Sequence, residues 1–72
     1  MKRTLTRAAL TDLKEGTKMT YTPPMSPPIE CEYYEGVDED GIAYAVFIRA
    51  AGIGYRGFIL YENDFKLVSY DG

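Results

Sequence analysis

Few side chains in this 72-residue chain are able to carry covalent or acid–base chemistry. The sequence contains no histidine, which removes the commonest general base, the Ser–His and Cys–His pairs, and most zinc sites. Its single cysteine, Cys31, alternates in phase with Ile29 and Tyr33, so we predict a buried structural thiol. A chain of this size buries only about 60% of its surface and cannot form both a core and a deep pocket. The sequence therefore favours a non-catalytic protein over an enzyme.

Two motifs resemble cofactor or metal sites, and neither has the expected surroundings. The run from Gly52 to Gly57 matches G-x-G-x-x-G, but residues 58–61 after it are strand-like, whereas a dinucleotide site needs a helix there. A glycine-rich hairpin is the simpler interpretation, with Gly57 at a bulge or a close backbone contact. The acidic turn before Gly41 lacks the carboxylates of a calcium loop at the first and last positions. We therefore predict no cofactor and no metal site.

The charged residues are unevenly distributed along the chain. The net charge is −3, yet residues 1–20 carry five basic and two acidic residues and residues 21–72 carry three basic and nine acidic ones. An acidic chain with a carboxylate-rich segment argues against a general nucleic-acid binder and suits a protein partner with a basic surface. The candidate protein-binding residues form the acidic strand and turn: Glu30, Glu32, Tyr34, Glu35, Asp38, Glu39 and Asp40.

The basic residues support a second hypothesis, in which the protein binds nucleic acid. The basic N-terminal segment would contact phosphates, and a tyrosine between two arginines in the glycine-rich hairpin would stack a base. The residues of this alternative site are Lys2, Arg3, Arg7, Arg49, Tyr55 and Arg56.

The chain holds seven tyrosines and three phenylalanines, more than so small a core can bury. Partly exposed tyrosines are either anchors of a protein-binding surface or core residues whose hydroxyls reach water. The sequence leaves both interpretations open. We expect partial exposure for Tyr21, Tyr34, Tyr55, Tyr61 and Tyr70.

The chain divides into residues 1–16 and residues 17–72. Leu5, Ala9 and Leu13 recur at helical spacing and Gly16 is able to end a helix, so residues 1–16 are predicted to form a short helix or a basic arm. About five strands follow, with a helical turn at 62–64, a proline-rich loop at 23–28 and a hairpin turn in which Gly41 takes a positive φ. The predicted strands are 17–22, 29–37, 42–50, 55–61 and 65–70. Both faces of 42–50 are apolar, so we predict that it is the central and most buried strand.

This layout resembles that of the SH3-like barrels from Leu13 to Ser69. Those domains often begin with Leu-x-x-Gly, here Leu13 to Gly16, and place one 3-10 turn before the last strand, here within 61–68. The resemblance implies a small closed antiparallel barrel. It does not imply SH3 peptide specificity, because the chain has no tryptophan and no Ala-Leu-Tyr-Asp-Tyr-like segment. In size and charge the chain is also similar to small phage-encoded inhibitor proteins.

We therefore expect a mainly β protein, a small SH3-like barrel with a short N-terminal helix or arm, that acts as a non-catalytic protein-binding module. In the sharper form of this hypothesis it is an inhibitor whose acidic face covers a basic, nucleic-acid-binding surface of a host protein. The lone cysteine and the lack of a signal-like or membrane-spanning apolar run predict a cytoplasmic protein that does not contact membranes. The oligomeric state is left open.

Overall fold

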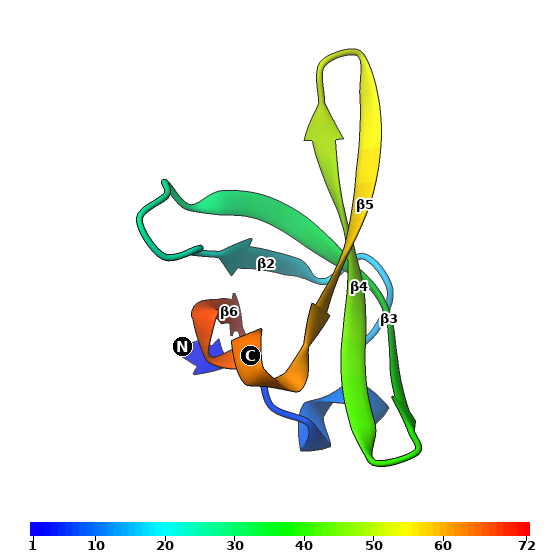
Figure 1. Cartoon of the computed structure of the whole chain (residues 1–72). Helices are drawn as coiled ribbons and strands as arrows, with labels where there is room; N and C mark the ends of the chain where they lie inside the picture. Colours follow the sequence, from blue (N-terminus) through cyan, green and yellow to red (C-terminus); the bar gives the residue numbers. More distant parts are fainter.

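The computed structural model describes all 72 residues as six strands and two short 3-10 helices (Figure 1). Every pair of neighbouring strands is antiparallel, and the strands lie in the order β1-β6-β2-β3-β4-β5. The fold is therefore mainly β, as predicted. The elements are β1 (Lys2–Thr4), η1 (Ala8–Thr11), β2 (Lys18–Tyr21), β3 (Ile29–Glu39), β4 (Ile42–Ala51), β5 (Gly54–Tyr61), η2 (Glu62–Leu67) and β6 (Val68–Asp71).

The sheet does not close into a barrel. Its two edges, β1 and β5, are not paired with each other. The helix η2 links β5 to β6 and packs against both edge strands, and its Phe65 is 2% exposed. Because η2 covers the core between the two edges, the domain buries its apolar side chains without a β1–β5 ladder. The closure implied by the SH3 resemblance is therefore wrong, whereas the helical turn before the last strand is confirmed. The turn extends to Leu67, so the prediction of a strand at 65–70 is wrong for residues 65–67, and the last strand begins at Val68.

The first residues form a strand in place of the predicted helix or basic arm. Lys2–Thr4 pairs with β6, and the next amide, that of Leu5, donates to the Val68 carbonyl at 3.0 Å. Only four residues, Ala8–Thr11, form the helical turn η1. A helix of about ten residues is marginal alone, and the free edge of β6 offers the backbone a better set of partners. Leu5 reaches the core from the sheet, and Leu10 packs against it from η1.

Eleven buried residues form one core on the inner face of the sheet. In β4, Ala43, Ala45 and Phe47 are at most 1% exposed. The outer face of β4 is not covered, and its Ile42 is 54% exposed. β4 contributes three of the eleven core residues, more than any other strand, but it lies next to the edge strand β5, so the prediction that 42–50 is the central strand is wrong. Its outer face stays uncovered because a 72-residue chain has no second layer to place there. The core comprises Leu5, Met19, Cys31, Tyr33, Ala43, Ala45, Phe47, Leu60, Phe65, Val68 and Tyr70.

A β-bulge in β3 sets the direction of its side chains. Tyr33 lies opposite Phe47, but Glu35 lies opposite Val46, so Tyr34 is an extra residue in the ladder. Strict alternation would turn Glu35 toward the core after Tyr33. The bulge places it on the outer face instead, while Tyr33 stays 3% exposed.

Gly41 lies in the turn between β3 and β4, and Gly57 lies within β5. Asp40 and Gly41 have φ of 52° and 77°, so the predicted positive φ at Gly41 is confirmed, and two consecutive positive values fit a two-residue hairpin turn. Gly57 pairs with Ile48 in an unbroken ladder, and a Cβ built on it would meet the Phe47 carbonyl at an ordinary 3.7 Å. The predicted bulge or close contact at Gly57 is therefore wrong.

No helix in this structure has the length and apolar character needed to cross a membrane.

The sheet separates into two hairpins at one end. The β3–β4 ladder stops at the Glu32–Ile48 pair, after which residues 29–31 stay with β2 and residues 49–51 stay with β5. Figure 1 shows β2–β3 and the tip of β4–β5 pointing in different directions, with that tip clear of the body of the domain. One hollow lies on each face of the sheet where the two hairpins diverge.

Candidate functional site

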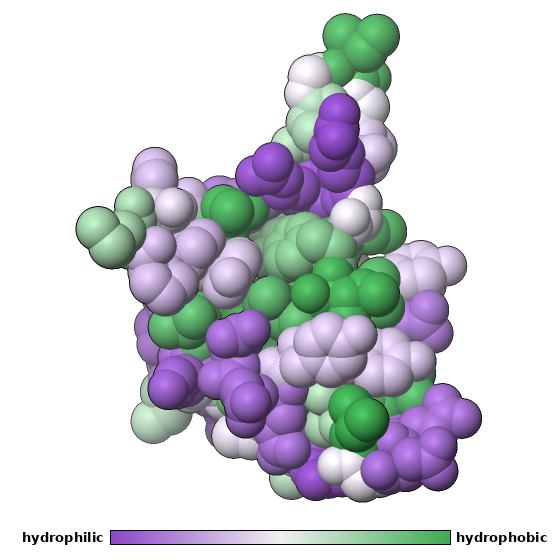
Figure 2. Space-filling view, in the orientation of Figure 1, coloured by the Kyte–Doolittle hydropathy of each residue, from purple (hydrophilic) through white to green (hydrophobic).

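An apolar strip occupies the outer face of β4 and β5. It consists of outward-facing side chains that alternate with the core residues of the same strands. Ile42, Ile59 and Tyr61 are each about half exposed, and the Tyr44 and Tyr61 rings lie 6.0 Å apart. Figure 2 shows hydrophobic side chains gathered over these two strands. The apolar strip is Ile42, Tyr44, Val46, Ile48, Ile59 and Tyr61.

A row of carboxylates runs beside the apolar strip on β3. Glu32 lies opposite Ile48, Glu35 opposite Val46 and Glu39 opposite Ile42, so three acids flank three apolar residues in register. Glu32 binds Lys18 Nζ at 2.7 Å. The other acids of this face form no ion pair. The acidic row is Glu30, Glu32, Glu35 and Glu39, all predicted from the sequence.

The remaining predicted protein-binding residues lie at different places. Tyr34, the bulge residue, is 44% exposed beside Glu35. Asp40 is in the β3–β4 turn. Asp38 faces the inner side, where the Arg7 guanidinium binds both of its carboxylate oxygens.

Arg7 links three elements through carboxylates. It precedes η1, binds Asp38 near the end of β3, and donates from Nη1 to Glu62 Oε1 of η2 at 3.3 Å. The hydrogen bond from Arg7 lowers the pKa of Asp38 and raises the pKa of Arg7 itself. These two residues therefore hold the N-terminal segment on the sheet, which reduces the charge that either can offer a ligand.

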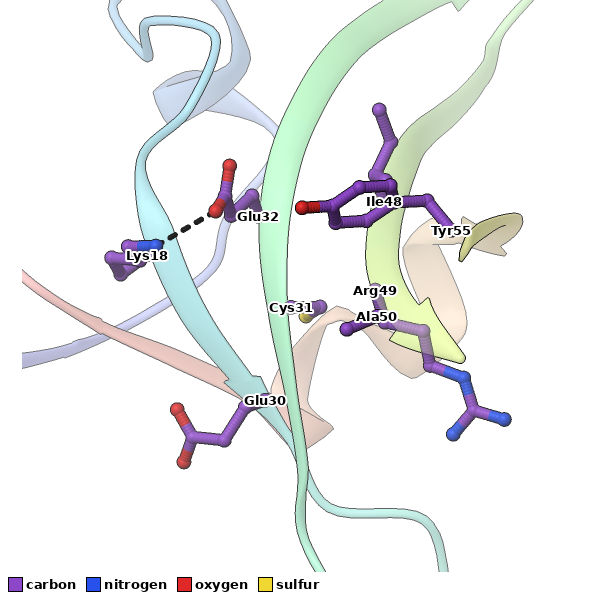
Figure 3. Close-up of a pocket in the computed structure, with 8 residues that line it drawn as sticks. All are labelled: Lys18, Glu30, Cys31, Glu32, Ile48, Arg49, Ala50 and Tyr55. Atoms are coloured by element: carbon purple, nitrogen blue, oxygen red, sulfur yellow. Dashed lines mark hydrogen bonds and ion pairs between the residues drawn. The ribbon is translucent and has the colours of Figure 1, made fainter. Parts of the chain in front are cut away.

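The outer hollow is lined by groups of both charges. It has a volume of about 270 Å³ and lies between β2–β3 and the β4–β5 tip, with the Lys18–Glu32 ion pair at one side and Tyr55 at the other (Figure 3). Cys31 lies behind them (Figure 3). Burial, and then the charge of Glu30, raise the pKa of this thiol to about 11. The thiol donates a weak hydrogen bond to the Met19 carbonyl at 3.5 Å. The predicted buried thiol is confirmed, and its high pKa does not suit a nucleophile.

The structure does not bring the alternative, basic set of residues together. Lys2 and Arg3 lie on β1 and Arg56 lies on β5, at opposite edges of the sheet. Arg49 and Arg56 are directly opposite each other on the inner face. Tyr55 points to the other face, where it lines the outer hollow.

Sequence reasoning missed an inner groove beneath the two arginines. Tyr21 and Phe58 stack there with ring centroids 5.8 Å apart, and Phe58 in turn stacks on the buried Phe47 at 5.4 Å. The strand pairing of β4 with β5 brings Arg49 and Arg56 over these rings. In the sequence, only the alternation of Arg56 with Phe58 indicated this groove. Tyr21 lies far from both in the chain, and the fold brings it beside Phe58.

The tyrosines divide between core and surface. Tyr34, Tyr55 and Tyr61 are exposed and Tyr21 is partly buried, as expected, but Tyr70 is 9% exposed and belongs to the core. Tyr70 pairs with Met19 and Arg3, so β1 covers the edge that would otherwise expose it. No group of three or more His, Cys, Asp or Glu side chains is arranged to hold a metal ion.

Comparison of this chain with protein-family models, with curated proteins and with solved structures gave no match.

Proposed function

We propose that this protein is a non-catalytic binding module that docks a basic protein on its outer face. A single observation carries the proposal: the apolar strip lies uncovered and in register with the acidic row. Isolated exposed apolar residues are ordinary on a protein surface, whereas six neighbouring apolar side chains on two adjacent strands, three half exposed and three partly buried, form a patch typical of interaction sites.

The charges of this face indicate the chemistry of the partner. The outward positions of β3, β4 and β5 carry carboxylates and no cation, because the register places Arg49 and Arg56 on the inner face. Arg49 also borders the outer hollow. Lys18 on β2 neutralises only Glu32. A partner with apolar side chains beside lysines or arginines would bury the strip and pair with the acidic row. Such charge complementarity speeds the encounter and selects the partner more than it adds affinity.

Tyr61 and Ile59 are the expected anchors of the interface. Both lie half exposed near the centre of the strip, and tyrosine is enriched among residues that dominate binding energy. Truncation of such an anchor costs about 2 kcal/mol or more, which corresponds to about thirtyfold in affinity.

The basic surface most suited to a row of carboxylates is one that otherwise binds phosphates. Glu32, Glu35 and Glu39 are spaced along one strand, as negative charges are along a nucleic-acid backbone. The proposed activity is therefore inhibition, in which the module occupies the nucleic-acid-binding surface of a partner in the cytoplasm. Duplex DNA added in excess would then compete with the module for that partner.

The test is capture of partners from a nuclease-treated bacterial lysate by the tagged protein and two charge-matched variants. One variant, E30Q/E35Q/E39Q, removes three charges from the acidic row. The control, D12N/E15Q/D64N, removes three charges from exposed residues away from this face. We expect a protein that the wild type and the control capture, that the acidic-row variant loses, and that duplex DNA releases.

Equal loss of capture in the two variants would show that net charge alone drives binding, and undiminished capture by the acidic-row variant would show that the row is not used. Either result would overturn the proposal. A second variant, I59S/Y61S, tests the apolar strip at unchanged charge. Retained capture by that variant would contradict a role for the strip. Circular dichroism of each variant separates loss of binding from loss of the fold.

A further inference from the structure

The inner groove differs from the other hollows of the molecule in its charge. It has a volume of about 370 Å³, within the usual range of small-molecule sites, and lies between β2–β3 and β5. Two arginines and no carboxylate line it, whereas acidic residues line each of the other three hollows. The residues around it are Tyr21, Ile29, Arg49, Arg56, Gly57, Phe58 and Leu60.

Arg49 and Arg56 are held together without a counterion. They are cross-strand neighbours on β4 and β5, and neither belongs to any ion pair of the structure. In Figure 3 the Arg49 guanidinium extends away from Glu30 and Glu32. Like charges directly opposite each other destabilise a sheet, and a bound anion would relieve that repulsion. Guanidinium groups form bidentate hydrogen bonds with phosphate in particular.

The floor of the groove is a row of aromatic rings. Phe47 is fully buried, Phe58 stacks on it, and Tyr21 stacks on Phe58 at the partly exposed end of the row. A flat aromatic ligand would continue this row on the Tyr21 side. Base–aromatic stacking beside arginines is how single-stranded nucleic acid is bound without sequence preference.

We propose that this groove binds a nucleotide, with its phosphate between Arg49 and Arg56 and its base stacked on Tyr21. The nucleotide is either free or part of a single strand, since both carry the same phosphate and base. This site is separate from the outer face, so an inhibitor could bind a nucleotide and a protein at once. The basic residues of β1 are not part of the site.

The test is titration of the full chain at low salt with AMP, with a fluorescent five-nucleotide oligothymidylate and with inorganic phosphate. We expect AMP and the oligonucleotide to bind and phosphate to bind at least tenfold more weakly. Affinity for the oligonucleotide should fall with salt at a log–log slope of about −0.7, the value for one neutralised phosphate of a single strand. An oligonucleotide at least tenfold tighter than AMP would identify the source as a strand, and equal affinities would identify a free nucleotide.

Two variants with equal loss of charge make the test specific. R49Q/R56Q should reduce affinity at least tenfold, whereas K2Q/R3Q should leave it unchanged. Y21L, which keeps an apolar side chain but removes the ring, should reduce affinity about tenfold, as expected for one lost stack. Equal loss in the two charge variants, equal affinity for phosphate and AMP, or no binding of either nucleotide would overturn the proposal. R49Q/R56Q should still capture the outer-face partner, so the two proposals fail independently.

Discussion

Replacement of Gly36 by alanine should loosen the contact between η1 and the sheet. A Cβ built at Gly36 would overlap the Tyr33 hydroxyl and lie 2.6 Å from Leu10 Cδ2, closer than real Cβ atoms come. Gly36 does not have a positive φ, so alanine is allowed by the backbone and its effect comes from packing. Overpacking of a core costs about 1–3 kcal/mol, while the loss of unfolded-state entropy from Gly to Ala returns about 0.4–1 kcal/mol. The expected net destabilisation is about 1–2 kcal/mol.

Thermal unfolding followed by circular dichroism measures this effect. For a domain of this size 1 kcal/mol corresponds to about 4–8 °C in Tm, so Gly36→Ala should lower Tm by about 5–15 °C. Gly54→Ala is the matched control, because nothing lies within 4 Å of its built Cβ, and it should leave Tm unchanged or slightly higher. In a Leu10→Ala background the cost of Gly36→Ala should fall, because only the overlap with the Tyr33 hydroxyl remains. The same cost in both backgrounds would mean that Leu10 does not pack on Gly36, and that η1 is not docked as described.

Three further predictions concern single charges and the thiol. Cys31, with a pKa of about 11 in place of 9.0, should react with a disulfide reagent at pH 8 at least about 100-fold more slowly in the folded protein than in denaturant, and equal rates would contradict its burial. Asp38 has a lowered pKa, so its contribution to stability is present above about pH 4 and is lost as pH falls through its folded value. Tm measured between pH 2 and pH 5 should therefore fall less steeply in Asp38→Asn than in the wild type. Arg56→Gln should raise the free energy of unfolding by about 0.2–1 kcal/mol at low salt, with no gain at high salt, because it removes the repulsion of Arg49.

The strands of residues 17–71 could be predicted because each carries a local signal. Period-two alternation in 29–37 and 42–50, and glycine at the turns, indicate strands and hairpins without reference to the rest of the chain. The N-terminal strand carries no such signal. Lys2–Thr4 is a strand only because β6 offers it an edge, and residues 1–16 alone give a weak helical period.

The site could be predicted only in part, for the same physical reason. The acidic row follows from one strand and its alternation, although the bulge at Tyr34 decides that Glu35 and Glu39 share a face with Glu30 and Glu32. The apolar strip was mistaken for buried surface, since the sequence does not say that no second layer covers β4. The inner groove depends on residues from β2, β4 and β5 that lie far apart in the chain, so no local pattern could place Tyr21 beside Phe58.

The acidic row would also oppose self-association of the domain through its uncovered apolar strip. The eight residues of β5 form a free edge with no proline, lysine or carboxylate, whereas the other edge, β1, is three residues long and bears Lys2 and Arg3. A long apolar edge of this kind invites the addition of a strand from another molecule.

Two copies that met through their outer faces would bring two acidic rows together and would repel each other. A basic partner would meet the same carboxylates favourably. The charges that would select the partner are thus the charges that would oppose self-association. Neutralising Glu30, Glu35 and Glu39 should therefore weaken partner capture. The same change should promote dimers or aggregates, measured by sedimentation at low salt. A monomeric E30Q/E35Q/E39Q variant at high concentration would contradict this link between the two roles.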